Sequence, residues 1–172
     1  LNGARKAIDT GKHVTGMALG SDDLMQWLAT QRNVVFRGAN HTHEVSVIRQ
    51  LDGFVSVNSA VEVDLFGQVN SEMTGDRQIS GTGGSVDFMR AAKASKDGRS
   101  IVAMNATARG GSVSRIVPKV EMVTALRTDV DTVVTEYGVA QIKDLPNAAR
   151  AEAMIEIAEP QFRDQSVSYT HL

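Results

Sequence analysis

The sequence contains no cysteine, which excludes disulfide bonds, thiolate metal ligands and a cysteine nucleophile. It also lacks a charge excess: 18 Lys and Arg stand against 20 Asp and Glu, so nothing favours nucleic acid or an anionic membrane as a partner. The apolar runs are short, and none approaches the roughly 20 residues that a membrane helix needs. The absence of cysteine is compatible with a reducing compartment, and we expect a cytoplasmic protein that does not bind membranes or nucleic acid.

The composition that remains fits one globular domain, because 42% of the 172 residues are hydrophobic and can bury a sizeable core. The sequence begins at Leu1 rather than at a methionine, and we expect a fragment whose upstream part has been removed. It ends in VSYTHL, which resembles the translation of a sequencing adaptor. We therefore expect one domain over residues 1–165 and a non-native tail over residues 166–172.

Strand and helix patterns alternate along the chain. The predicted strands are residues 13–19, 34–37, 54–65, 101–104, 113–117 and 132–135. The predicted helices are one that Ser21 caps, followed by residues 44–50, 85–95 and 146–158, the last ended by Pro160. Residues 67–70 turn the chain back into an antiparallel partner. We therefore expect a layered α/β fold, with helices packed on a mixed sheet rather than on a purely parallel one.

The most suggestive stretch for chemistry is Gly81-Thr82-Gly83-Gly84-Ser85, just before a predicted helix. Backbone N–H groups without side chains around them can approach an anion or a developing oxyanion closely at a helix N-terminus. The stretch lacks the Gly-Lys-Ser/Thr of a nucleotide-binding loop and the spacing of a dinucleotide fingerprint. A tight turn that needs positive φ explains the same glycines, so both interpretations stay open.

Arg109 precedes a pair of glycines and can reach a phosphate with two donors, although a solvated surface arginine explains it equally well. Glu136 follows a predicted strand, where α/β folds place ligands, and is either a functional carboxylate or a structural partner. There is no Gly-x-Ser-x-Gly motif, so serine hydrolase chemistry is not indicated.

Two further pairs of side chains have a functional and a structural interpretation. His41 and His43 would share a face if extended and could hold a metal, but no third ligand is spaced nearby, and we expect no metal site. Glu62 and Asp64 share a face of a predicted strand. They could act as an acid/base pair or hold a hard cation, or they could be solvated or bonded to a neighbouring turn.

Taken together, several segments in this order resemble the acetyl-CoA hydrolase/transferase family, which includes 4-hydroxybutyrate and succinyl-CoA:acetate CoA-transferases. The segments are Ala18-Leu19-Gly20-Ser21, residues 54–70, residues 81–88, Ser114-Arg115-Ile116-Val117-Pro118 and Val134-Thr135-Glu136-Tyr137-Gly138. The resemblance covers about residues 1–165, and this part of the chain is similar to the C-terminal domain of that family.

The resemblance implies an enzyme in which two α/β domains enclose coenzyme A. A glutamate attacks an acyl-CoA to give an acyl-glutamyl anhydride, CoA converts this to a glutamyl-CoA thioester, and a second carboxylate takes over the CoA. The family glutamate would lie upstream of Leu1. The resemblance therefore implies that the fragment alone is inactive, with the N-terminal domain of the same enzyme, an acyl-CoA and a short-chain carboxylate as its partners.

The resemblance also assigns residues. It implies that Gly83 and Gly84 make the backbone oxyanion contacts, and that Gly81, Gly83, Gly84, Arg109 and Asn40 contact CoA or its acyl group. It implies no metal and no covalently bound cofactor, with CoA as substrate, and a homo-oligomer when full length. Acetyl-CoA hydrolysis and a non-catalytic CoA-binding module are the alternatives that remain open.

Overall fold

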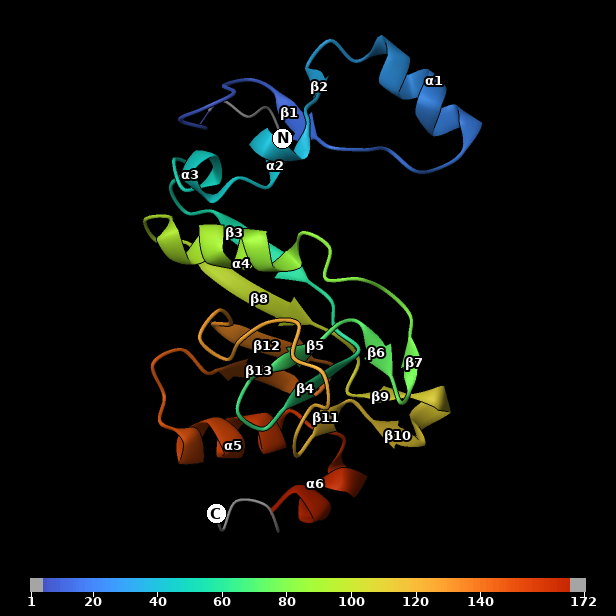
Figure 1. Ribbon diagram of the computed structural model, residues 1–172, viewed down its shortest axis with the longest axis vertical. Coiled ribbons are helices and arrows are strands. Elements are labelled where there is room, and N and C mark those ends of the chain that lie inside the picture. Colours follow the sequence, from blue (N-terminus) through green and yellow to red (C-terminus); the bar gives the residue numbers. More distant parts are fainter. Residues whose placement is uncertain (1–4, 168–172) are drawn as a thin grey trace.

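The computed structural model describes residues 5–167 (Figure 1). Its strands are β1 His13–Thr15, β2 Val34–Phe36, β3 Val55–Asn58, β4 Glu62–Asp64, β5 Val69–Asn70, β6 Met73–Thr74, β7 Arg77–Gln78, β8 Arg99–Ala103, β9 Thr107–Ala108, β10 Val113–Ser114, β11 Ile116–Val117, β12 Thr132–Thr135 and β13 Gly138–Gln141. Its helices are α1 Asp22–Thr30, α2 Ala39–Thr42, α3 Val45–Ile48, α4 Ser85–Ala94, the 3-10 helix η1 Arg109–Gly111, α5 Asn147–Glu156 and α6 Pro160–Val167. Within residues 5–167, none of these helices is both long and apolar enough to cross a membrane.

The largest sheet has the order β13-β12-β8-β3. Strands β3, β8 and β12 run parallel, whereas β13 returns antiparallel to β12. Helices α4 and α5 pack on the face of this sheet that carries the buried Val102, Val133 and Ala140. The predicted layered α/β fold with a mixed sheet is therefore confirmed.

The single long strand predicted over residues 54–65 is wrong. The chain forms β3 and then β4, and these belong to different sheets, because β4 pairs with β5 and β11 rather than with β8. Between them the Arg115 guanidinium donates to the backbone carbonyls of Ala60 and Val61, the latter at 2.9 Å. These carbonyls are thereby satisfied outside a strand ladder, which lets the chain change sheets.

In the sequence, Val55 and Val57 alternate with Ser56 and Asn58, which predicts an apolar face of valines on β3, but the structure reverses the burial. Val55 and Val57 are 48% and 64% exposed, whereas Ser56 between them is 3% exposed and lies on the side that α4 covers. Ser56 Oγ accepts a hydrogen bond of 2.7 Å from Asn58 Nδ2, so its burial leaves no hydroxyl unpaired. The alternation of the side chains is as predicted, but the buried face is the opposite one.

The C-terminal helices differ in one respect from the sequence prediction. Helix α5 ends at Glu156, and Pro160 does not end it but begins α6. This fits the preference of proline for the first turn of a helix, where its missing N–H costs nothing. Of the predicted tail, residues 166 and 167 belong to α6, and residues 168–172 lie outside the described residues.

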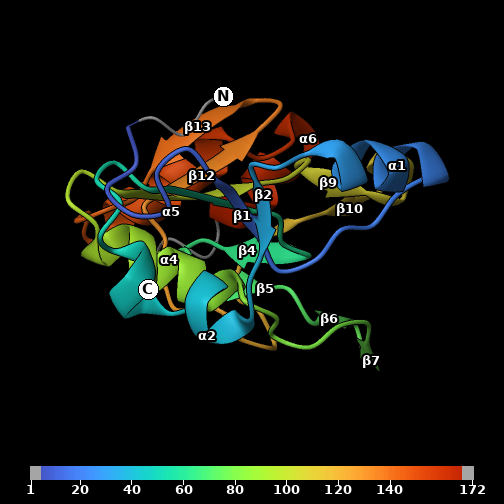
Figure 2. The same cartoon turned by 90° about the horizontal axis from the view of Figure 1, so that it is seen from above.

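The segment β1-α1-β2 forms a separate unit, in which the two strands pair in parallel and α1 connects them. Ser21 caps α1 as predicted, since its Oγ accepts the Leu24 N–H at 3.4 Å. The helical spacing of Leu24, Trp27 and Leu28 predicts that these side chains face inward, and for Trp27 this is wrong, because its side chain is 53% exposed. Both views show α1 projecting beyond the rest of the molecule (Figures 1 and 2).

Candidate functional site

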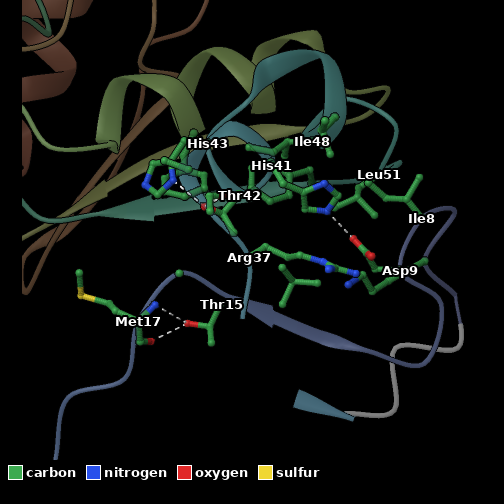
Figure 3. Close-up of a pocket in the computed structure, with 18 residues that line it drawn as sticks. Ile8, Asp9, Thr15, Met17, Arg37, His41, Thr42, His43, Ile48 and Leu51 are labelled. Atoms are coloured by element: carbon green, nitrogen blue, oxygen red, sulfur yellow. Dashed lines mark hydrogen bonds and ion pairs between the residues drawn. The ribbon is translucent and has the colours of Figure 1, made fainter. Parts of the chain in front are cut away.

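A cavity of about 640 Å³ lies between β1 and the helices α2, α3 and α4 (Figure 3). Most of its wall is apolar, and its charged groups gather on one side. The lining residues are Lys6, Ile8, Asp9, Val14, Thr15, Gly16, Met17, Arg37, Gly38, Ala39, His41, Thr42, His43, Val47, Ile48, Leu51, Phe54 and Phe88. Three separate parts of the chain therefore meet here: residues 6–17, residues 37–54 and Phe88.

The charged side of this cavity is organised by an ion pair. His41 Nε2 and Asp9 Oδ2 are 2.9 Å apart and join α2 to the segment that leads into β1. The hydrogen bond from His41, assisted by the positive charges of His41, Lys6 and Arg37, holds the pKa of the Asp9 carboxyl below its ordinary value of 3.8 against the opposing effect of desolvation. Asp9 therefore stays ionised and ties β1 to the cavity wall.

Replacing Asp9 with asparagine is expected to lower the urea midpoint of unfolding at pH 7, and this loss should shrink as the pH falls toward 3. A carboxyl whose pKa is depressed in the folded state stabilises the protein above its unfolded pKa, and that contribution is lost as the pH falls through the folded pKa. The measurement is urea unfolding at both pH values. In a His41→Ala background, Asp9→Asn should have little further effect; an undiminished effect there would contradict the pairing.

His43 connects the cavity to the glycine-rich loop. Its Nδ1 lies 2.8 Å from Thr42 Oγ1, and its ring lies 4.7 Å from the ring of Phe88 in α4, centroid to centroid. A Cβ at Gly84 would lie 2.0 Å from His43 Cδ2. The sequence analysis explained the missing side chain at Gly84 by the close approach of a ligand, whereas in the structure the imidazole ring of His43 occupies that space.

Gly84→Ala should destabilise the protein by about 1–3 kcal/mol, because the new methyl group displaces the His43 ring from Phe88. Backbone strain does not contribute, since Gly84 has φ −100° and ψ 8°, which alanine adopts readily. In a His43→Ala background the same substitution should cost much less, giving a coupling energy of at least about 1 kcal/mol. Urea unfolding of the unmodified protein, the two single variants and the double variant measures this coupling energy. Additive effects would show that contact with the His43 ring does not cause the loss of stability.

The glycine-rich loop itself leads into the N-terminus of α4. Gly81 and Gly83 are exposed, a Cβ added at either would meet no atom within 4 Å, and Gly83 has φ +56°. Gly84 occupies the N-cap without a side chain to bond the helix. The first N–H groups of an α-helix have no partner within it, and its N-terminus carries a partial positive charge. The positive φ at Gly83, which favours glycine, confirms the tight-turn interpretation of the loop. The anion interpretation stays a prediction, for which the N–H groups at the start of α4 provide the donors.

The other two residues assigned to CoA, Arg109 and Asn40, lie outside the glycine-rich loop. Arg109 is exposed, has φ +51° and stands at the start of η1, where its carbonyl accepts a 2.9 Å hydrogen bond from Ser112 Oγ. Asn40 is exposed in α2, beside the cavity but outside its lining among the described residues. The structure thus brings Asn40 and Gly84 near the same cavity and leaves Arg109 apart from it.

The carboxylates considered for acid/base chemistry have structural partners. Asp64 is fully buried and accepts hydrogen bonds from the N–H groups of Phe66 and Gln68. Glu62 Oε2 accepts a long hydrogen bond of 3.4 Å from Asn70 Nδ2, so its partner is Asn70 and not Asp64. Glu136 Oε2 accepts the Ala106 N–H at 2.7 Å. The structural interpretation therefore holds for Asp64 and Glu136.

The histidine pair is not extended, which removes the premise of a shared face. His41 lies in α2 and His43 is its C-cap; the first binds Asp9 and the second packs on Phe88. Among the described residues, no group of three His, Cys, Asp or Glu side chains is placed to hold a metal ion.

Sequence reasoning missed Asp9, Arg37 and the role of His41 in the cavity wall. Asp9 and His41 are 32 positions apart, and no local pattern signals such a pairing. The sequence signals only the turn, through Asp9 and the nearby Gly11, and in the structure Asp9 has φ +48° there.

Comparison with known proteins adds to this geometry. Residues 20–169 match the sequence model of the acetyl-CoA hydrolase/transferase C-terminal domain. The chain is 43% identical to the 4-hydroxybutyrate coenzyme A transferase of Clostridium kluyveri over 167 residues, which cover 95% of this chain and 39% of that protein. It is 39% identical to the butyryl-CoA:acetate CoA-transferase of Anaerostipes caccae, covering 97% of this chain and 39% of that protein.

Among solved structures, the 4-hydroxybutyrate CoA-transferase of Porphyromonas gingivalis superposes with a TM-score of 0.85 at 36% identity. That match covers 99% of this chain and 40% of the other chain. This chain therefore spans well under half the length of the relatives that it matches.

Proposed function

The chain belongs to the acetyl-CoA hydrolase/transferase family through its C-terminal domain, and from this premise we propose that it is the CoA-binding part of an enzyme that transfers CoA between a short-chain acyl-CoA and a free carboxylic acid. The remainder of the enzyme, its N-terminal domain, supplies the nucleophilic glutamate. Coenzyme A thioesters and short-chain carboxylates are the substrates, and the enzyme needs neither a metal nor a covalent cofactor.

The observation that carries this proposal is the loop of Gly81 to Gly84, exposed up to Gly83, at the N-terminus of α4, whose N-cap has no side chain to bond the helix. Attack on a thioester carbonyl places negative charge on its oxygen, and preorganised N–H donors at a helix N-terminus stabilise that charge. Gly83 leaves open space where a side chain would otherwise stand, which admits the thioester. We assign the oxyanion contacts to the backbone of Gly83 and Gly84.

In the proposed reaction, the glutamate carboxylate attacks the acyl carbonyl and the C–S bond breaks, which gives an acyl-glutamyl anhydride and the CoA thiolate. The thiolate then attacks the glutamyl carbonyl and releases the first acid. A second carboxylate attacks the glutamyl-CoA thioester, and CoA returns to the new acyl group in the reverse sequence. The loop holds the oxyanion at each addition, Arg109 contacts CoA as a cation, and Asn40 lies toward the acyl group.

Hydrolysis is the second candidate function, since the family contains hydrolases as well as transferases by its description. The two activities share the glutamyl-CoA thioester and differ in what attacks its glutamyl carbonyl: a second carboxylate takes over the CoA, whereas water restores the glutamate and releases free CoA. A non-catalytic CoA-binding module is the remaining alternative, and it predicts no thioester at all.

The complete protein should be incubated with butyryl-CoA and acetate while both CoA thioesters and free CoA are followed by chromatography. A transferase produces acetyl-CoA, a hydrolase releases free CoA without needing acetate, and a binding module does neither. After incubation with acyl-CoA alone, mass spectrometry should find CoA attached to a glutamate outside residues 1–172. Binding of CoA without any turnover across short acids would overturn the enzymatic proposal.

A further inference from the structure

The hairpin of β6 and β7 leads directly into the glycine-rich loop. Its two strands pair antiparallel, and every residue from 74 to 83 is exposed. Figure 2 shows this hairpin projecting from the rest of the molecule. A segment without buried side chains gains little stabilisation from packing, so its position is set by the points at which its ends are attached. The position of the glycine-rich loop therefore depends on how the base of the hairpin is fixed.

Both strands of the hairpin meet at one residue, Glu72. The Glu72 carbonyl accepts the N–H groups of Ile79 at 2.8 Å and of Ser80 at 3.3 Å, and these bonds close the base of the hairpin. The Glu72 N–H donates to the side-chain oxygen of Asn70, a residue of β5 that is 2% exposed, at 3.0 Å. Ser80 stands only three positions before Gly83. The base of the hairpin thus also fixes one end of the loop.

Thr124 connects this base to the core. Its hydroxyl donates to Glu72 Oε2 at 2.8 Å and accepts the N–H of Ser71 at 2.9 Å. Its own N–H donates at 2.7 Å to the carbonyl of Val69, which is fully buried in β5. Glu72 and Thr124 are 52 positions apart, so a single hydroxyl joins two distant segments at this point. We call the contact between this hydroxyl and the carboxylate the Glu72–Thr124 clamp.

The other end of the loop is fixed independently of the clamp. Gly84 is the N-cap of α4, and the ring of His43 lies against it. Between the two fixed ends, Gly83 has φ +56°, and among the described residues no atom lies within 4 Å of the place where its Cβ would stand. The direction of the Gly83 N–H therefore follows from the positions of the two ends.

We propose that Glu72 and Thr124 are positioning residues of the oxyanion site. Their hydrogen bond holds the base of the hairpin at the distance from α4 at which the N–H groups of Gly83 and Gly84 converge on one oxygen. The inference rests on the proposed function, because it takes that oxygen to be the thioester carbonyl oxygen. Stabilisation of an oxyanion depends on preorganised donors, and a displacement of about 1 Å in a positioning element can cost about 100-fold in rate.

Thr124→Val in the complete enzyme removes the hydroxyl and keeps the shape of the side chain. We expect kcat for CoA transfer from butyryl-CoA to acetate to fall by about 10- to 100-fold, because the displaced donors no longer fit the transition state. KM for butyryl-CoA should stay within about 3-fold, since neither residue of the clamp touches the substrate. Thr124→Ser keeps the hydroxyl and should retain kcat within about 3-fold. A kcat for Thr124→Val within that same range would refute the clamp.

Variants of Glu72 separate hydrogen bonding from charge. Glu72→Gln keeps a side-chain oxygen that can accept from Thr124, so kcat should stay within about 3-fold, whereas Glu72→Ala should lower it as far as Thr124→Val does. In the double variant Glu72→Ala/Thr124→Val, the second substitution should add less than about 3-fold, because both remove the same contact. Losses that multiply would show that the two side chains act separately, and the proposal would fail.

Ser95→Ala is the control for a general loss of stability. The Ser95 hydroxyl likewise donates to an oxygen, the Leu51 carbonyl at 2.6 Å, and accepts a backbone N–H, that of Phe54 at 3.2 Å. It lies at the C-cap of α4, the opposite end of the helix from the loop. Ser95→Ala should lower the urea midpoint about as much as Thr124→Val and keep kcat within about 2-fold. An equal fall of kcat in both variants would mean that lost stability is the cause and would contradict the proposal.

Hydrogen exchange in the complete enzyme reads the clamp without catalysis. Thr124→Val should speed exchange of the Ile79 amide, which bonds Glu72, by at least about 10-fold and leave the Phe88 amide in α4 unchanged. An unchanged Ile79 amide is incompatible with the proposal. The two proposals fail separately: an unmodified enzyme without CoA chemistry refutes the function, whereas an active enzyme whose kcat survives Thr124→Val refutes only the positioning role.

Discussion

Replacing Gly83 with leucine in the complete enzyme is expected to lower kcat/KM for CoA transfer by about 100- to 1,000-fold, the usual cost of losing an oxyanion donor. The leucine side chain would occupy the open space before α4 where the proposed thioester lies. It would therefore keep the thioester carbonyl oxygen away from the N–H groups at the N-terminus of α4. The measurement is the initial rate of acetyl-CoA formation from butyryl-CoA and acetate at several substrate concentrations.

The control for this experiment is Gly75→Leu. Gly75 has φ +52° against +56° at Gly83, and neither has an atom within 4 Å of an added Cβ. Both leucines therefore impose the same left-handed backbone strain, about 1–2 kcal/mol, without a steric clash. Gly75 lies in the turn between β6 and β7, so its variant should lose the same stability and keep kcat/KM within about 2-fold. Equal kinetic losses in the two variants would mean that strain, not an oxyanion contact, explains the effect.

The fold was predictable where local chemistry decides it. The Ser21 cap, the glycine-rich entry to α4 and the antiparallel return through residues 67–70 all follow from short-range rules, and the structure has each of them. The error over residues 54–65 has a non-local cause, since the contact that separates β3 from β4 comes from Arg115, far along the chain. The reversed burial of β3 follows from α4, whose covered side cannot be read from alternation alone.

The candidate site divides in the same way. The loop of Gly81 to Gly84 was recognisable because glycine marks both positive φ and close approach, yet the sequence could not say that His43 occupies the space above Gly84. The Asp9–His41 pair was invisible, because nothing links the two positions until the chain folds. Local rules thus located the helix N-terminus, and tertiary contacts decided what surrounds it.

Asp64→Ala is expected to destabilise the protein by about 3 kcal/mol or more, the largest loss of stability that we predict for a single side chain. The Asp64 carboxylate is fully buried and accepts three hydrogen bonds: from the Phe66 N–H at 3.0 Å, the Gln68 N–H at 2.9 Å and the Gln68 side-chain amide at 2.7 Å. Alanine leaves these donors without an acceptor in the turn that connects β4 to β5, and an unsatisfied buried donor costs about 1–3 kcal/mol. Urea unfolding measures the change.

Two companion substitutions separate hydrogen bonding from charge and from position. Asp64→Asn keeps one oxygen for the two backbone N–H groups, so it should cost about 1 kcal/mol. Glu62→Ala removes a carboxylate from the same strand that is only half-buried and whose contact to Asn70 Nδ2 is 3.4 Å long, and it should cost less than about 1 kcal/mol. If Glu62→Ala were as damaging as Asp64→Ala, the two carboxylates would be acting together, as an acid/base or cation-binding pair, and the purely structural role assigned to Asp64 would be wrong.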